Sequence, residues 1–157
     1  YLGKMTDIIL HHGGTIDEFL GDAVLAAFGA PSVSADHATK AVNCAIQMQE
    51  AMAEINAENI ADGLPVIEMA IALNTGEVVA GNIGSERRSK YGFVGHQVNL
   101  TSRIEDDARP HEILISEQTY QALNGDQFVA GKSRTIKAKG IEELLTVYPI
   151  VGSSSNA

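Results

Sequence analysis

The carboxylate of Asp22 is the first group in this sequence placed to do chemistry. Asp22 follows Gly21 and is itself followed by the apolar run AVLAAF. Gly-Asp is a frequent turn pair, so Asp22 is expected at the exposed tip of a hairpin. From such a tip a carboxylate oxygen can reach a hard cation such as Mg²⁺. An ordinary surface turn is the alternative that the residues alone leave open.

The second group is the pair Asn99 and Arg103. These residues are four apart on an expected helix of about residues 97–106, so their side chains share one face. An amide beside a permanent cation suits a ribose oxygen and a phosphate oxygen. A solvated helix face is the alternative.

The third group is basic. Lys137 and Lys139 are two apart in an expected strand, so both point to the same side. They could bind a polyphosphate, or they could protect an edge strand from aggregation.

These groups must be positioned by helices and strands that the hydrophobic pattern predicts. Apolar spacing predicts alternating helices and strands, and Ser34 or Asp36 can cap the longest helix, which ends near Ala61. Helices interleaved with strands predict an α+β fold, a mostly antiparallel sheet with its helices on one face. The expected helices are residues 1–12, 36–61, 97–106 and 116–125, and the expected strands lie within residues 15–28, 66–74, 77–82, 90–94, 112–116, 128–137 and 144–151.

Composition limits the class of protein. The chain has 157 residues, enough for one domain over residues 1–150 and a flexible tail over 151–157. Its net charge of −9 argues against binding nucleic acid, and it has no apolar run of the about 20 residues that cross a bilayer. Cys44 is the single cysteine, which fits a reducing cytoplasm. Up to Glu86 there are two basic residues against twelve acidic ones, and from Arg87 onward there are nine against eight.

Four stretches together closely resemble the class III nucleotidyl cyclase catalytic domain, the adenylate/guanylate cyclase family. The resemblance covers the chain to about residue 150. It implies a ferredoxin-like α+β fold and a head-to-tail homodimer whose active sites lie between the subunits. It also implies a phosphorus-oxygen lyase that converts a nucleoside triphosphate into a 3′,5′-cyclic monophosphate and pyrophosphate. The stretches are HGGTIDEFLGDAVLAAFGAP (12–31), ALNTGEVVAGNIGSERR (72–88), GHQVNLTSRIE (95–105) and IKAKGIEELLTVY (136–148).

The resemblance assigns a role to each chemical group. Asp22 is implied to be one of two aspartates that bridge two divalent cations, Mg²⁺ or Mn²⁺, which stabilise the attacking and leaving oxygens. Asn99 is implied to orient the ribose, Arg103 to stabilise the phosphoryl transition state and Lys137 to hold the terminal phosphates. The uneven charge agrees with acids from one subunit facing bases from its partner.

Two positions bear on the choice of base. Glu18 lies four residues before Asp22, where guanylate cyclases usually carry Glu and adenylate cyclases usually carry Lys. A carboxylate can accept the two adjacent donors of guanine, and it repels the ring acceptor of adenine. Gly92 occupies the family's second base-selecting position and supplies no side chain. GTP is therefore the expected substrate, for intracellular signalling through cyclic GMP, and ATP is the alternative.

The family's first strand, which carries the other metal aspartate, would precede residue 1. We therefore expect an N-terminally incomplete domain with weak or no activity by itself. In the parent protein we expect an upstream regulatory domain and a cytoplasmic location, with membrane tethering through an upstream segment left open. A non-catalytic, cyclase-like regulatory dimerisation domain and an unrelated α+β binding module are the non-enzymatic alternatives.

Overall fold

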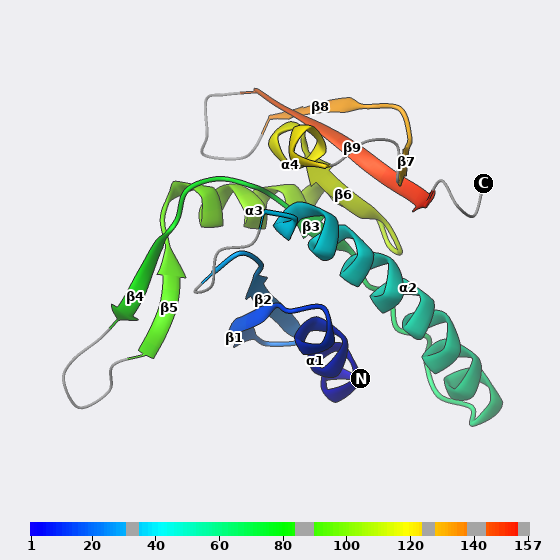
Figure 1. The fold of residues 1–157 in the computed structure, drawn as a ribbon. Helices are drawn as coiled ribbons and strands as arrows, with labels where there is room; N and C mark the ends of the chain where they lie inside the picture. The colour runs from blue at the N-terminus through cyan, green and yellow to red at the C-terminus, as the bar shows by residue number, and fades with distance from the viewer. Residues whose placement is uncertain (31–34, 84–89, 124–127, 138–143, 154–157) are drawn as a thin grey trace.

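A mostly antiparallel sheet forms one side of the molecule, and two hairpins stand apart from it (Figure 1). The structure is a computed structural model that describes residues 1–30, 35–83, 90–123, 128–137 and 144–153. The helices are α1 (Leu2–His11), α2 (His37–Ala61), α3 (His96–Asp107) and α4 (Glu117–Ala122). The strands are β1 (Thr15–Leu20), β2 (Ala23–Ala27), β3 (Ile71–Leu73), β4 (Val79–Ile83), β5 (Lys90–Val94), β6 (Ile113–Ser116), β7 (Phe128–Ala130), β8 (Arg134–Lys137) and β9 (Leu144–Ser153).

The main sheet is organised around β9. Its strand order is β3-β6-β9-β7, and β8 also pairs with β9. Val147 pairs with Ser116 of β6 and with Arg134 of β8, so these two strands lie on opposite edges of β9. Only the β3–β6 pair of this sheet is parallel. The predicted α+β class with a mostly antiparallel sheet is therefore confirmed.

Strand β6 is buried on both faces. Ile113 and Ile115 belong to a core cluster with Val42 of α2, whereas Leu114 belongs to a cluster with Ile104 of α3. Because alternate residues of a strand point to opposite faces, α2 and α3 pack on opposite sides of β6. The helices are thus less one-sided than expected, since an inner strand needs cover on both faces.

The segment before β3 is shorter as a strand than expected. Residues 66–74 were predicted to form one strand, and only Ile71–Leu73 does so. Asn56 of α2 donates to the Ile67 carbonyl at 2.9 Å and accepts from the Ile67 N–H at 2.8 Å, and Gln49 donates to the Met69 carbonyl at 2.9 Å. Side chains of α2 therefore satisfy backbone groups that a ladder would otherwise use.

The β1–β2 hairpin packs with α1 rather than with the main sheet. Met5 and Ile9 of α1 share a cluster with Met52 of α2, and the hairpin residues Val24 and Phe28 pack against it. Within the described residues, no strand pairing joins this hairpin to the five-stranded sheet. A cavity of about 450 Å³ lies between the β2 segment and the β3 segment, and most of its lining is apolar.

The remaining boundaries follow the sequence with small differences. The predicted strand over residues 128–137 is two strands, β7 and β8, and β9 continues to Ser153, past the expected end of the domain at residue 150. Ser116 caps α4 as predicted, accepting from the Thr119 N–H at 3.2 Å. Ser34, Lys139 and residues 154–157 lie outside the described residues. Among the helices of the described part, none is long and apolar enough to cross a bilayer.

We expect Leu114→Ala to destabilise the domain by about 2–5 kcal/mol, because it leaves a cavity where α3 meets β6. Leu114 is 0% exposed. Chemical denaturation followed by circular dichroism measures the change. Val151→Ala is the control, because Val151 is 67% exposed and its truncation should cost less than about 0.5 kcal/mol. Equal losses in the two variants would contradict this account of the core.

Candidate active site

Asp22 lies at the turn that joins β1 to β2, exposed as the sequence predicted. Gly21 makes this turn possible, because its φ of +65° lies in the left-handed region that glycine adopts without a steric penalty. Leu20 pairs directly with Ala23, so the turn is tight. The Tyr1 hydroxyl donates to the backbone carbonyl of Asp22 at 3.5 Å, which leaves the carboxylate itself for other partners. The position suits a cation ligand supplied from a hairpin tip.

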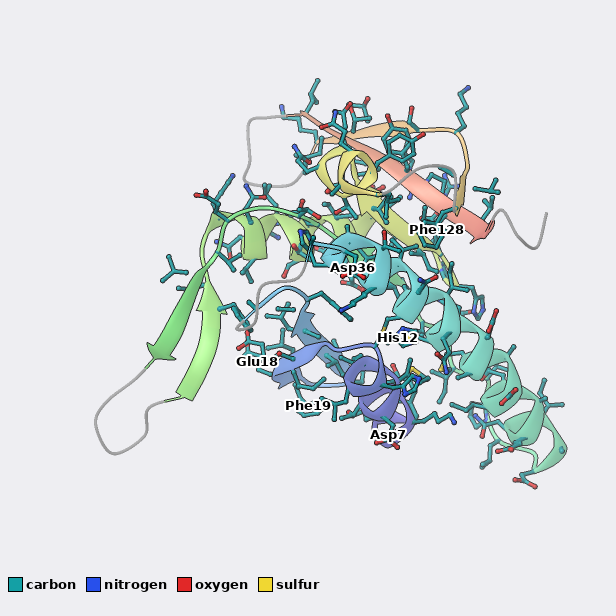
Figure 2. The ribbon with its side chains drawn as sticks, viewed as in Figure 1. Asp7, His12, Glu18, Phe19, Asp36 and Phe128 are labelled. Atoms are coloured by element: carbon teal, nitrogen blue, oxygen red, sulfur yellow. The ribbon has the colours of Figure 1, made fainter. Side chains whose placement is uncertain are left out.

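Glu18 lies in β1, on the part of the hairpin nearest β5 (Figure 2). Strand β1 contacts β5, and β5 carries Gly92. The two positions expected to select the base therefore lie on neighbouring strands. A bulge between Ile16 and Glu18 interrupts the register at Asp17. The strict alternation of side chains along a strand therefore does not apply between Asp17 and Glu18.

Glu105 is an acidic neighbour of Asp22 that the sequence analysis missed. It lies on α3 and lines the same cavity as Asp22. Burial raises the pKa of Glu105, and the like charges of Asp106 and Asp22 raise it further. Nothing in the local sequence sets Glu105 apart from the two aspartates that follow it, so only the tertiary structure could identify it.

Asn99 and Arg103 lie on the outer face of α3, exposed to solvent. Both are on the predicted helix, and Arg103 is 44% exposed with its guanidinium 3.7 Å from the Asp106 carboxylate. Neither lines the cavity that Asp22 borders. Successive helical residues are rotated by about 100°, so Arg103 and Glu105 point in nearly opposite directions. Since Glu105 lines the cavity that Asp22 borders, Arg103 points away from this cavity of its own chain.

The first turn of α3 is fixed to the end of β3. The Asn74 amide donates to the Gln97 carbonyl at 3.1 Å and to the Gln97 side-chain oxygen at 2.9 Å. Gly95 precedes the helix with φ of +139°, a conformation that favours glycine. Leu100 and Ile104 are buried on the opposite side of the helix from solvent. The outer face with Asn99 and Arg103 is therefore held in a defined direction.

Lys137 is the last residue of β8 and is exposed. The residue before it, Ile136, is buried and shares a cluster with Ile104 of α3. The strand that carries Lys137 and the helix that carries Arg103 thus contribute to the same core cluster. Lys139, its expected companion, lies outside the described residues.

The metal-binding capacity of the described residues is partial. Asp22 has the hard oxygen donor that Mg²⁺ prefers, and Mg²⁺ commonly uses one or two carboxylates together with substrate phosphates and water. Within the described ranges, no three His, Cys, Asp or Glu side chains come together to form a metal site. Asp22 therefore suits one cation whose other ligands are substrate phosphates and water. The described residues do not by themselves form a two-cation site.

Comparison with known proteins shows the family to which the chain belongs. Residues 3–152 match the family of adenylate and guanylate cyclase catalytic domains. Adenylate cyclase 1 of Rhizobium meliloti (strain 1021) is 31% identical over 153 residues, which are 97% of this chain and 23% of that protein. The chain thus spans about a quarter of that relative's length.

Two solved structures show the same fold. The structure of the guanylyl cyclase Cya2 is 49% identical with a TM-score of 0.92, and the match covers 98% of this chain and 78% of the other. The structure of the adenylyl cyclase CyaB from P. aeruginosa is 35% identical with a TM-score of 0.90, covering 100% of this chain and 81% of the other.

Fold and site together define a catalytic domain of the nucleotidyl cyclase class, whose members are lyases. This chain belongs to the adenylate and guanylate cyclase catalytic domain family.

We expect Asp22→Asn to lower the pKa of Glu105 toward its usual value, because the change removes a nearby like charge. Burial and Asp106 should still keep that pKa above normal. A ¹³C NMR titration of the glutamate carboxyls measures it, with Glu105→Gln used to assign the signal. Asp17→Asn is the matched control from the same hairpin. An unchanged Glu105 titration in Asp22→Asn would show that the two carboxylates are not neighbours.

Proposed function

We propose that this domain converts GTP into 3′,5′-cyclic GMP and pyrophosphate, as a cytoplasmic signalling enzyme. The observation that carries the choice of GTP is the position of Glu18 on a strand next to the one that carries Gly92. A carboxylate there accepts the ring N–H and the exocyclic amino group of guanine together. Adenine offers this carboxylate a ring acceptor in place of those two donors, which supports strong discrimination.

Adenylate cyclase activity is the second candidate, and it is favoured by the lack of a side chain at Gly92. Glycine at this position supplies no side chain to the base, so it adds nothing to the selectivity of Glu18. Both a guanylyl and an adenylyl cyclase are among the similar structures. The relative turnover of GTP and ATP therefore decides between the two.

The site that we propose is shared by two copies of the chain. Asp22 borders the cavity between β2 and β3, whereas Asn99 and Arg103 face outward from α3. Since a single copy directs these groups apart, a head-to-tail homodimer is the arrangement that lets Asp22 of one copy face Asn99 and Arg103 of the other. Two equivalent sites then form across one interface.

Each side chain has a defined task in the reaction that we propose. The substrate's 3′-oxygen bonds to the α-phosphorus as its proton passes to solvent water, and the bond from that phosphorus to the bridging oxygen breaks, so that pyrophosphate leaves. Asn99 hydrogen-bonds the ribose and holds the 3′-oxygen in line, which removes orientational freedom before the reaction. Arg103 compensates the negative charge that builds up on the phosphoryl oxygens, and Lys137 binds the terminal phosphates. Divalent cations, Mg²⁺ or Mn²⁺, would neutralise phosphate charge at Asp22.

The proposal also concerns the complete protein. Because the Rhizobium relative is much longer than this chain, we also propose that a regulatory domain in the parent protein controls the cyclase. A non-catalytic role is less well supported, since Asp22, Asn99, Arg103 and Lys137 are all present.

Glu18→Lys tests both the reaction and the choice of base. In the full-length protein with Mn²⁺, we expect cyclic GMP from GTP in the unmodified enzyme. In the variant, the ratio of GTP to ATP turnover should fall by about a hundredfold, because an ammonium group repels the guanine donors. Chromatography of the cyclic products measures both reactions.

Glu50→Lys is the matched control, because it makes the same charge change at an exposed position on α2. This control should keep the original ratio. Absence of any cyclic nucleotide from the unmodified protein would overturn the proposed reaction. An unchanged ratio in Glu18→Lys would remove Glu18 as the base-selecting residue.

A further inference from the structure

Arg134 joins three separate parts of the chain with one side chain. It lies on β8, and its Nη1 and Nη2 donate to the two carboxylate oxygens of Glu112 at 3.0 and 2.7 Å. Its Nε donates to the Asp107 carboxylate at 3.2 Å, and Nη2 also donates to the Asp107 backbone carbonyl at 3.1 Å. Asp107 is the last residue of α3, and Glu112 immediately precedes β6.

These contacts offset negative charge that is concentrated at the C-terminal end of α3. The C-terminal end of a helix carries partial negative charge and unpaired carbonyls. Here Asp106 and Asp107 add two carboxylates, and the last turn contains no basic residue. Arg134 supplies both the missing positive charge and a donor for a terminal carbonyl, so it acts as a helix cap provided by a distant strand.

Arg103 lies one helical turn before Asp107, the α3 residue that Arg134 holds. Arg103 and Asp107 are four residues apart on the helix, and Arg103 also lies 3.7 Å from Asp106. The other end of α3 is tied to Asn74, and Ile104 packs against Ile136 of β8. Arg134 therefore sets the direction of the C-terminal turn of α3 relative to β8, the strand that ends in Lys137.

We propose that Arg134 is a positioning residue for the cyclisation reaction, which aligns Arg103 with the reacting phosphate by fixing the last turn of α3. This inference rests on the proposed function. Arg134 itself is not a substrate-contacting group, because its side chain is 23% exposed and its guanidinium is already engaged by Asp107 and Glu112. A misplacement of about 1 Å at a reacting group can cost about a hundredfold in rate, so this control of direction has a measurable consequence.

The ionisation of Glu112 supports a permanent contact at neutral pH. The hydrogen bonds from Arg134 lower the pKa of Glu112, against the opposing effect of burial. A carboxyl with a lowered pKa contributes stability above its usual titration range, and that contribution is lost as the pH falls through the lowered pKa. The Arg134–Glu112 pair is therefore formed throughout the neutral range.

The test compares Arg134→Met and Arg134→Lys with Lys132→Met in the full-length protein. Lys132→Met removes a positive charge from an exposed position just before β8, so it should leave kcat and KM unchanged. We expect Arg134→Met to lower kcat for GTP by about tenfold or more while KM changes less than twofold, since Lys137 still binds the terminal phosphates. Arg134→Lys should recover part of kcat, because an ammonium keeps the charge and loses the bidentate geometry.

Hydrogen exchange gives a second readout that does not depend on activity. Amides of residues 104–108 should exchange faster in Arg134→Met than in Lys132→Met, whereas those near Gln97 should not. A kcat that stays unchanged in a folded Arg134→Met, or a rise in KM with constant kcat, would overturn the positioning role. If the unmodified protein makes no cyclic nucleotide, the proposed function fails instead. In that case unchanged exchange at residues 104–108 would still overturn the contact that the positioning role requires.

Discussion

The proposed site depends on the directions in which side chains point around the axis of α3. One side of this helix presents Glu105 toward Asp22, another buries Leu100 and Ile104, and the remaining face presents Asn99 and Arg103 to solvent. Arg103 does not line the cavity that Asp22 borders, and it lies on a different side of α3 from Glu105, which does. Asp22 and the pair Asn99 and Arg103 therefore lie on different sides of α3. Our proposal of a site shared by two copies follows from this separation.

The rest of the fold holds this helix in place. Ile104 of α3 shares a core cluster with Leu114 and Ile136. The Asn74 side chain, next to β3, hydrogen-bonds the first turn of α3, and Arg134 hydrogen-bonds the last turn. The anchors belong to different strands of one sheet, so the direction of α3 depends on the pairing of β3, β6, β9 and β8. A polar site of this kind gains its precision from a buried apolar layer beneath it.

Local patterns in the sequence were enough to predict most of what surrounds the site. The Gly21-Asp22 turn and the Asn99–Arg103 face depend on the chain within a few residues, and both were predicted correctly. The bulge at Asp17 and the loss of the strand before Ile71 were not predicted. The segment before β3 is held by side chains of α2 that lie 11 and 20 residues away in the sequence and have no local signature.

Two features of the surroundings of α3 were not apparent in the sequence for the same reason. Glu105 and Arg134 are ordinary charged residues in the sequence. Asp22, which acts on Glu105, and Glu112, which binds Arg134, each lie more than twenty residues away from them. A pattern of residue types can predict which elements carry catalytic groups. The direction in which α3 presents those groups depends on tertiary contacts that only the three-dimensional structure contains.

Coexpression of two inactive full-length variants, Asp22→Asn and Arg103→Ala, tests the shared site most directly. In a head-to-tail dimer of one copy of each, one site loses both groups and the other keeps both. Random pairing in equal amounts then predicts recovery of about a quarter of the original cyclase activity, measured after each variant alone is shown to be inactive. If the mixture stays as inactive as the separate variants although mixed dimers form, Asp22 and Arg103 of one chain serve the same site and the account is wrong.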